Sequence, residues 1–113
     1  MKAGQTQLWV MQIALLLALL AFAAPSMEAQ GADAALYKTK CAACHGPDGK
    51  GDTSIGKANK LRDLGSNDTQ GQTDAALARI VADGKGKMPA YRKSLAPEQI
   101  ESLITFIRTL AKK

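Results

Sequence analysis

The chain contains two cysteines, Cys41 and Cys44, and its single histidine, His45, directly follows the second of them. Residues three or four apart are neighbours on the surface of an α-helix, so a helix here would present both thiols and the imidazole together. Ala42 and Ala43 are small and would let a flat group approach that face. This cluster constrains the fold more than any other feature, because the remaining elements must leave space for what it binds.

The spacing Cys-x-x-Cys-His is the attachment pattern of c-type haem. It predicts one covalent haem, held by thioethers from Cys41 and Cys44, with His45 as an axial ligand of the iron. Three interpretations compete with it. A thioredoxin-like redox pair needs a βαβ context that the sequence lacks. A structural zinc site needs four ligands, so a carboxylate would have to join Cys41, Cys44 and His45. A structural disulfide would close a very short loop and stabilise little.

The second axial ligand is expected to be Met88, because the chain has no other histidine. Residues 84–89 are rich in glycine and lysine, which does not suit a core helix face, and Pro89 favours an extended conformation at Met88. Met27 is the other candidate, and it lies in or beside the N-terminal apolar region. The alternative role for Met88 is to fill a gap in a loop. A thioether opposite an imidazole predicts a raised reduction potential.

The N-terminal segment has the layout of a secretory signal peptide: a positive start, an almost entirely apolar stretch at 8–24, and small residues after it. Cleavage is predicted after Ala23 or Ala29, which makes 1–29 the signal peptide and 30–113 the mature domain. The alternative is an uncleaved membrane anchor, for which the apolar stretch is somewhat short of the roughly 20 residues usually needed. Export predicts a bacterial periplasmic protein without stable membrane insertion after cleavage.

Three stretches predict α-helices, and none shows the alternating pattern of a strand, so the expected fold class is all-α. The first runs from about 33 to 44. The second begins at Thr73, a good N-cap, and ends at Gly84. The third runs over 97–110, with Pro97 at its first position. Its apolar residues recur at helical spacing: Ile100, Leu103, Ile104, Ile107 and Leu110.

The connection over 45–73 is long and punctuated by glycines, with a short helix expected at about 54–61. Connections of this length inside a small domain usually have a function. The predicted mature domain is small and poor in aromatic residues, so its own side chains give it only a marginal core. A loop that wraps a large apolar cofactor would explain both features.

Together these features resemble the small bacterial class I cytochromes c, which carry one haem with His and Met ligands. The resemblance runs from about Asp33 to Lys113. It is carried by the segment Cys41–Gly49, by Lys87-Met88-Pro89-Ala90-Tyr91 and by the helix Pro97–Leu110. It implies a fold of three main helices and loops wrapped around one covalent haem, with the first and last helices crossing near it. It also implies a one-electron shuttle.

The same resemblance implies that Tyr37 packs against the C-terminal helix, where Phe106 is the answering aromatic residue. The chain departs from the family pattern in three places. A very small residue usually sits about two turns before the first cysteine, where the helices cross, and here Ala34 would have to serve. The His45 ring N–H is expected to donate to a backbone carbonyl in the long connection over 45–73. Many members carry a proline in the stretch that corresponds to 59–64, and this chain has none, so that carbonyl is not identified. Ala96 stands where a Ser or Asp cap would be expected, which should weaken the last helix slightly.

The net charge is +5, and basic residues gather in the two long loops. They predict a positive rim around the haem edge that steers acidic redox partners, and an ordinary solvated surface is the alternative. Export argues against nucleic-acid binding, and we expect a monomer. The basic residues are Lys50, Lys57, Lys60, Arg62, Lys85, Lys87, Arg92 and Lys93, with Lys60 or Arg62 as a partner for a haem propionate.

The expected function is that of a periplasmic one-electron carrier in which the haem iron cycles between ferric and ferrous states. It is not expected to be an enzyme, because two protein ligands leave the iron no open position. Two alternatives remain. The chain could be a haem subunit docked on a larger oxidoreductase, or a ligand-binding or peroxidatic haem protein if Met88 is easily displaced.

Overall fold

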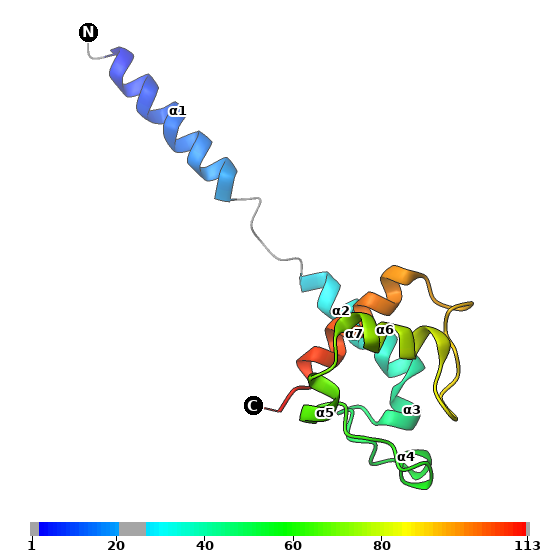
Figure 1. Ribbon diagram of the computed structural model, residues 1–113. Helices are drawn as coiled ribbons and strands as arrows, with labels where there is room; N and C mark the ends of the chain where they lie inside the picture. The colour runs from blue at the N-terminus through cyan, green and yellow to red at the C-terminus, as the bar shows by residue number, and fades with distance from the viewer. Residues whose placement is uncertain (1–2, 21–26, 113) are drawn as a thin grey trace.

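The computed structural model describes residues 3–20 and 27–112. Helix α1 (Ala3–Leu20) stands apart from the other helices in Figure 1, and its large apolar side chains over 8–16 are exposed. In the described parts of the chain, no helix is both long enough and apolar enough to span a bilayer. The predicted cleavage site at Ala23 lies outside the described residues, whereas Ala29 lies within α2 (Met27–Lys40).

The predicted helix over 33–44 is two helices, because the chain turns at Cys41 between α2 and α3 (Ala42–His45). Cys41 has φ −119° and ψ −35°, and the amide N of Cys44 donates to the carbonyl of Cys41 at 3.2 Å. In an uninterrupted α-helix that amide would bond to the carbonyl of Lys40. The turn therefore leaves the Lys40 carbonyl available to another donor.

The second and third predicted helices are confirmed. Helix α6 (Asp74–Asp83) is capped by the hydroxyl of Thr73 and ends at Gly84, and helix α7 (Pro97–Thr109) begins with its proline. Ala96 has no side-chain acceptor to offer, but the amide side chain of Gln99 accepts from the Ala96 backbone N–H at 2.9 Å. This bond provides half of a capping box at the start of α7.

The long connection contains two short helices, α4 (Ser54–Ala58) and α5 (Asn67–Gln70). The first agrees with the short helix expected at about 54–61, and the second was not predicted. Both begin with a hydroxyl cap, from Thr53 and Ser66 respectively. Caps of this kind fix the start of helices that are too short to be stable alone.

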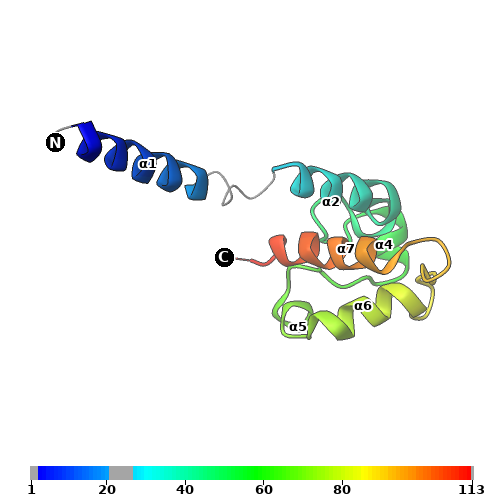
Figure 2. The same ribbon diagram turned by 90° about the horizontal axis from the view of Figure 1, so that it is seen from above.

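Helix α7 lies at the centre of the helical body, between α2 and α6, as Figure 2 shows. Tyr37 on α2 is only 1% exposed, and its ring centroid lies 4.5 Å from that of Phe106 on α7, with 35° between the ring planes. The predicted aromatic contact is thus confirmed. Residues 3–20 and 27–112 contain no β-strand, so the all-α class is confirmed. The buried apolar core consists of Tyr37, Leu77, Val81, Ala82, Leu95, Ile100, Leu103, Ile104 and Ile107.

Candidate functional site

The four residues predicted to hold the haem and its iron all line one cavity of about 610 Å³. Cys41, Cys44 and His45 belong to the attachment segment, which we define as residues 41–45. Met88 reaches the same cavity from a loop more than 40 positions later in the sequence. The walls are largely apolar: Leu61, Leu64, Leu77, Ile80, Val81, Leu103 and Ile107. This enclosure suits a large, flat and mostly apolar ligand.

The two thiols are free and half-buried. Burial, and secondarily the neighbouring Cys44, raise the pKa of the Cys41 thiol to about 11. Reactive redox pairs instead have thiols of lowered pKa, so the thioredoxin-like interpretation gains no support. The zinc interpretation gains none either, because among the described residues no group of three or more His, Cys, Asp or Glu side chains is arranged to hold a metal ion.

The imidazole of His45 has a buried Nδ1 atom that lacks a hydrogen-bond partner among the described residues. The backbone acceptor that we expected in the long loop is therefore not present within hydrogen-bonding distance. Burial also lowers the pKa of His45, which favours the neutral ring that binds metal. Buried polar atoms are rarely left unpaired. An orphaned ring nitrogen beside two thiols, on the wall of an apolar cavity, fits a site that a covalent haem completes.

The Met88 segment, which we define as residues 84–90, is a tight loop rather than part of a helix. Lys85 and Met88 exchange two backbone hydrogen bonds, with N–O distances of 3.2 and 2.9 Å. Gly84 has φ +75°, and a Cβ atom there would lie 2.6 Å from the carbonyl oxygen of Met88. Only glycine suits this position, and the turn that it permits presents Met88 to the cavity.

The rim of the cavity is positive. Its lining includes five exposed cationic residues and no Asp or Glu: Lys40, Lys60, Arg62, Lys85 and Lys87. Two members of the predicted rim lie elsewhere and are paired. Lys57 forms an ion pair with Asp52 at 2.7 Å, and Arg92 forms one with Asp83. Lys50 and Lys93 are also absent from the lining, whereas Lys40 belongs to it and was missed because it lies on a predicted helix rather than in a loop.

Two residues to which our sequence analysis assigned no role organise the site. Thr53 donates its hydroxyl to the carbonyl of Cys44 at 2.7 Å and accepts from the amide of Gly56 at 2.8 Å. Tyr91 donates its phenol to the carbonyl of Lys40 at 3.0 Å. Thr53 could have been found as the N-cap of the expected short helix, but no local signal in the sequence connects Tyr91 with Lys40.

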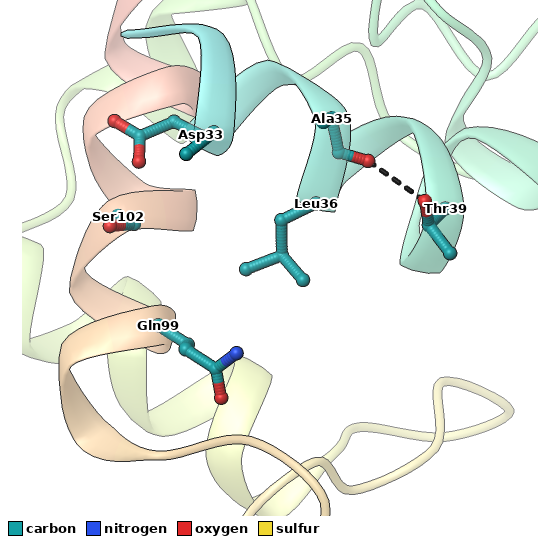
Figure 3. A pocket seen from close by; sticks show the side chains of 7 residues that line it. Asp33, Ala35, Leu36, Thr39, Gln99 and Ser102 are labelled. Carbon is teal, nitrogen blue, oxygen red and sulfur yellow. Dashed lines mark hydrogen bonds between the residues drawn. The ribbon is translucent and has the colours of Figure 1, made fainter. Parts of the chain in front are cut away.

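A second, shallower hollow of about 360 Å³ lies between α2 and α7 (Figure 3). Asp33, Leu36 and Thr39 line it from α2, and Gln99 and Ser102 line it from α7. The Thr39 hydroxyl already donates its hydrogen bond to the Ala35 carbonyl at 2.9 Å, within the same helix. None of the predicted site residues lies there, so the candidate site is the cavity at the attachment segment.

Comparison with known proteins points to the same site. Residues 28–107 match the family model of cytochrome c oxidase, cbb3-type, subunit III. The chain is 39% identical over 72 residues to the cbb3-type cytochrome c oxidase subunit CcoP of Rubrivivax gelatinosus. This alignment covers 63% of this chain and 23% of that protein. It is 34% identical over 89 residues to cytochrome c6 of Nostoc sp., covering 77% of each.

Among solved structures, the chain is similar to KustC0563 c-type cytochrome, with a TM-score of 0.66 and 26% identity. The match covers 71% of this chain and 98% of that one. The chain thus spans most of the smaller relatives but only 23% to 29% of three cbb3-type subunits. On the evidence of the family match, the helical fold and the cavity lined by the attachment segment and Met88, the chain belongs to the cytochrome c family and is a small class I cytochrome c, a covalent haem c protein.

Proposed function

We propose that this protein is a periplasmic one-electron carrier in which Cys41 and Cys44 hold the haem and His45 and Met88 ligate its iron. One observation carries the proposal: all four side chains line a single, largely apolar cavity, although Met88 is far from the others in sequence. The haem, when bound, supplies a ferric/ferrous couple. The cytochrome c6 relatives, of which the chain covers most, support a carrier rather than an enzyme.

Each residue has a separate task in this proposal. The thiols of Cys41 and Cys44 anchor the cofactor, and the neutral imidazole of His45 offers a nitrogen lone pair. With the haem bound, the thioether of Met88 would hold the iron together with His45 and would keep water and small molecules from it. A Met ligand opposite His favours the reduced state and raises the potential. With both positions filled by protein, the chain has no place for a substrate and no reaction of its own.

The first test is the optical spectrum of the matured protein, oxidised and reduced, with and without carbon monoxide. We expect the reduced spectrum of the natural protein to be unchanged by carbon monoxide. Met88→Ala should open the iron to carbon monoxide and lower the potential by a substantial part of the roughly 0.8 V range that axial ligands control. Met88→His is the matched control, because it should keep the iron closed while still lowering the potential.

Two results would contradict the ligand assignment: ready binding of carbon monoxide by the natural protein, or an unchanged potential in Met88→Ala. The first would favour a ligand-binding or peroxidatic haem protein. The covalent attachment is tested separately by extraction with acidified acetone, which should leave the pigment on the natural protein and remove it from a Cys41→Ser/Cys44→Ser variant that acquires haem.

We also propose that the positive rim guides acidic redox partners to the cavity. The rim residues are exposed, and no carboxylate lies among them to neutralise their field. Attraction of this kind speeds encounter and weakens as salt rises. It can be measured without knowing the partner, by following electron transfer to a small anionic oxidant and to a small cationic one over a range of ionic strength.

With the natural protein, the rate should fall with salt for the anionic oxidant and rise for the cationic one. Lys85→Gln/Lys87→Gln should flatten both dependences. Lys38→Gln/Arg79→Gln is the control, because it removes the same charge from exposed residues that do not line the cavity. Equal effects of the two double variants would mean that only net charge matters and that the rim has no special role.

A second function has specific support, since the matching family model describes a subunit of an oxidase. In this alternative the chain docks permanently on a larger oxidoreductase and passes electrons within it. Size measurement of the protein extracted from its native periplasm separates the two. A carrier elutes as a free monomer, and a docked subunit copurifies with its larger partner in a fixed ratio. N-terminal sequencing of the same material tests cleavage after Ala23 or Ala29.

A further inference from the structure

The Met88 segment is held to the rest of the molecule at few points. Within the described part of the chain, the backbone N–H groups of residues 85–90 make two hydrogen bonds to other backbone groups. Both are bonds that Lys85 and Met88 exchange with each other. Its rim lysines, Lys85 and Lys87, are exposed. A loop with few bonds to its surroundings opens easily, so whatever closes it must act at its ends.

Tyr91 stands at the C-terminal end of this segment and makes two bonds to different elements. Its backbone N–H donates to the carbonyl of Val81 on α6 at 3.1 Å. Its phenol donates to the carbonyl of Lys40 at the end of α2, 51 positions earlier in the chain, at 3.0 Å. The ring also lines the cavity and packs against the core. Tyr91 therefore joins the Met88 side of the cavity to the cysteine side.

The acceptor is available for a structural reason. The chain turns at Cys41, and the amide of Cys44 bonds to the Cys41 carbonyl instead of the Lys40 carbonyl. Lys40 is thus left with one of the unpaired carbonyls that end every helix. The phenol of Tyr91 satisfies it immediately before the first cysteine, so the bond connects the attachment segment to the loop that carries Met88.

We infer that Tyr91 is a positioning residue whose hydrogen bond to the Lys40 carbonyl holds the Met88 segment closed over the cavity and so keeps added ligands from the iron. The inference rests on the proposed role of Met88 as a ligand. If the inference holds, loss of the Tyr91 phenol makes Met88 easier to displace. Loss of a hydrogen bond that serves only overall stability would not have this effect.

The test uses haem-loaded Tyr91→Phe, which removes the phenol oxygen and keeps the ring. Tyr37→Phe is the matched control. Its phenol also donates to a backbone carbonyl, that of Gly46 at 2.8 Å, but it lies on α2 and makes no contact of this kind with the Met88 segment. The probe is imidazole, titrated into the ferric protein, and the near-infrared absorption band of the Met–iron bond reports displacement of Met88. Unfolding by denaturant is measured in parallel.

We expect Tyr91→Phe to bind imidazole roughly threefold to tenfold more tightly than the natural protein, the range that one hydrogen bond accounts for. Tyr37→Phe should leave imidazole affinity unchanged while lowering the denaturant midpoint, because its bond is buried. Unchanged imidazole affinity in Tyr91→Phe would overturn the inference. So would equal increases in both variants, since general loosening would then explain the effect.

Failure of the proposed function would look different. If the natural protein lacks the near-infrared band and binds imidazole as freely as Met88→Ala, Met88 is not a ligand and the inference falls with it. If the band is present and only the Tyr91→Phe result is negative, the ligand assignment stands and the positioning role alone is wrong.

Discussion

Thr53 connects the attachment segment to the long loop that follows it. Its hydroxyl donates to the carbonyl of Cys44 and accepts from the amide of Gly56, so one side chain satisfies two backbone groups. The backbones approach closely here, because a Cβ atom on Gly56 would lie 2.1 Å from the Gly51 carbonyl oxygen. The hydroxyl of Thr53 thus joins the end of the attachment segment to the start of α4.

We predict that Thr53→Val, which keeps the shape but removes the hydroxyl, lowers the free energy of unfolding by about 1 to 3 kcal/mol through the lost cap and the unpaired Cys44 carbonyl. Thr53→Ser should retain most of the stability, since it keeps the oxygen. Denaturant unfolding of the haem-loaded proteins measures both. A loss of stability in Thr53→Ser with little loss in Thr53→Val would show that the methyl group, rather than the hydroxyl, is what matters.

At the scale of elements, α7 is joined to the α5–α6 region by hydrogen bonds as well as by apolar packing. Arg108 donates from Nη1 to the carbonyl of Gln70 at 2.7 Å and from Nη2 to the carbonyl of Gln72 at 2.5 Å. Its Nε donates to the carboxylate of Asp74 at 2.8 Å. Gln70 in turn donates to the carbonyls of Leu64 and Ile107. One guanidinium thus fixes the start of α6 against the end of α7.

The contacts of Arg108 differ in their exposure, and this predicts unequal mutational effects. The Asp74 side chain is 75% exposed, against 29% for Arg108. Asp74→Asn should therefore cost no more than about 1 kcal/mol, as exposed ion pairs do. Arg108→Met should cost about 1 to 3 kcal/mol, because it leaves backbone carbonyls without their donor. Thermal and denaturant unfolding test this order, and a larger loss for Asp74→Asn would contradict it.

At the scale of the whole molecule, the cavity is a substantial part of a small interior. Its walls include Leu77, Val81, Leu103 and Ile107, which also belong to the hydrophobic core. These side chains pack on one another on one side and face the cavity on the other. A bound haem would complete their packing, so folding and haem attachment should be strongly coupled.

We predict that the Cys41→Ser/Cys44→Ser variant, when it lacks haem, retains helix but unfolds without cooperativity and binds an apolar dye, as loosely packed states do. The haem-loaded natural protein should unfold in one cooperative step. Circular dichroism in the far and near ultraviolet, with dye fluorescence, makes the comparison. A single cysteine variant that keeps its haem through one thioether is the control, and it should stay cooperative. Cooperative unfolding of the haem-free variant at the natural midpoint would contradict the prediction.

The sequence by itself determined the parts of this protein that depend on neighbouring residues. Thr73 and Pro97 mark the starts of α6 and α7, because caps and first-turn prolines act within a few positions. The cluster at 41–45 predicted the attachment chemistry from its spacing alone. Met88 was selected as the partner of His45 by elimination and by its loop, and the structure places it on the same cavity, where its ligand role is a proposal.

Only the tertiary structure decided which distant groups meet. The bond from Tyr91 to Lys40 and the contacts of Arg108 join segments more than 30 positions apart. The tertiary structure also decided which cations belong to the rim, because Lys40 lines the cavity while Lys57 and Arg92 pair with carboxylates elsewhere. Local patterns cannot specify such contacts, since their free energies arise only once the packed helices bring donor, acceptor and charge together.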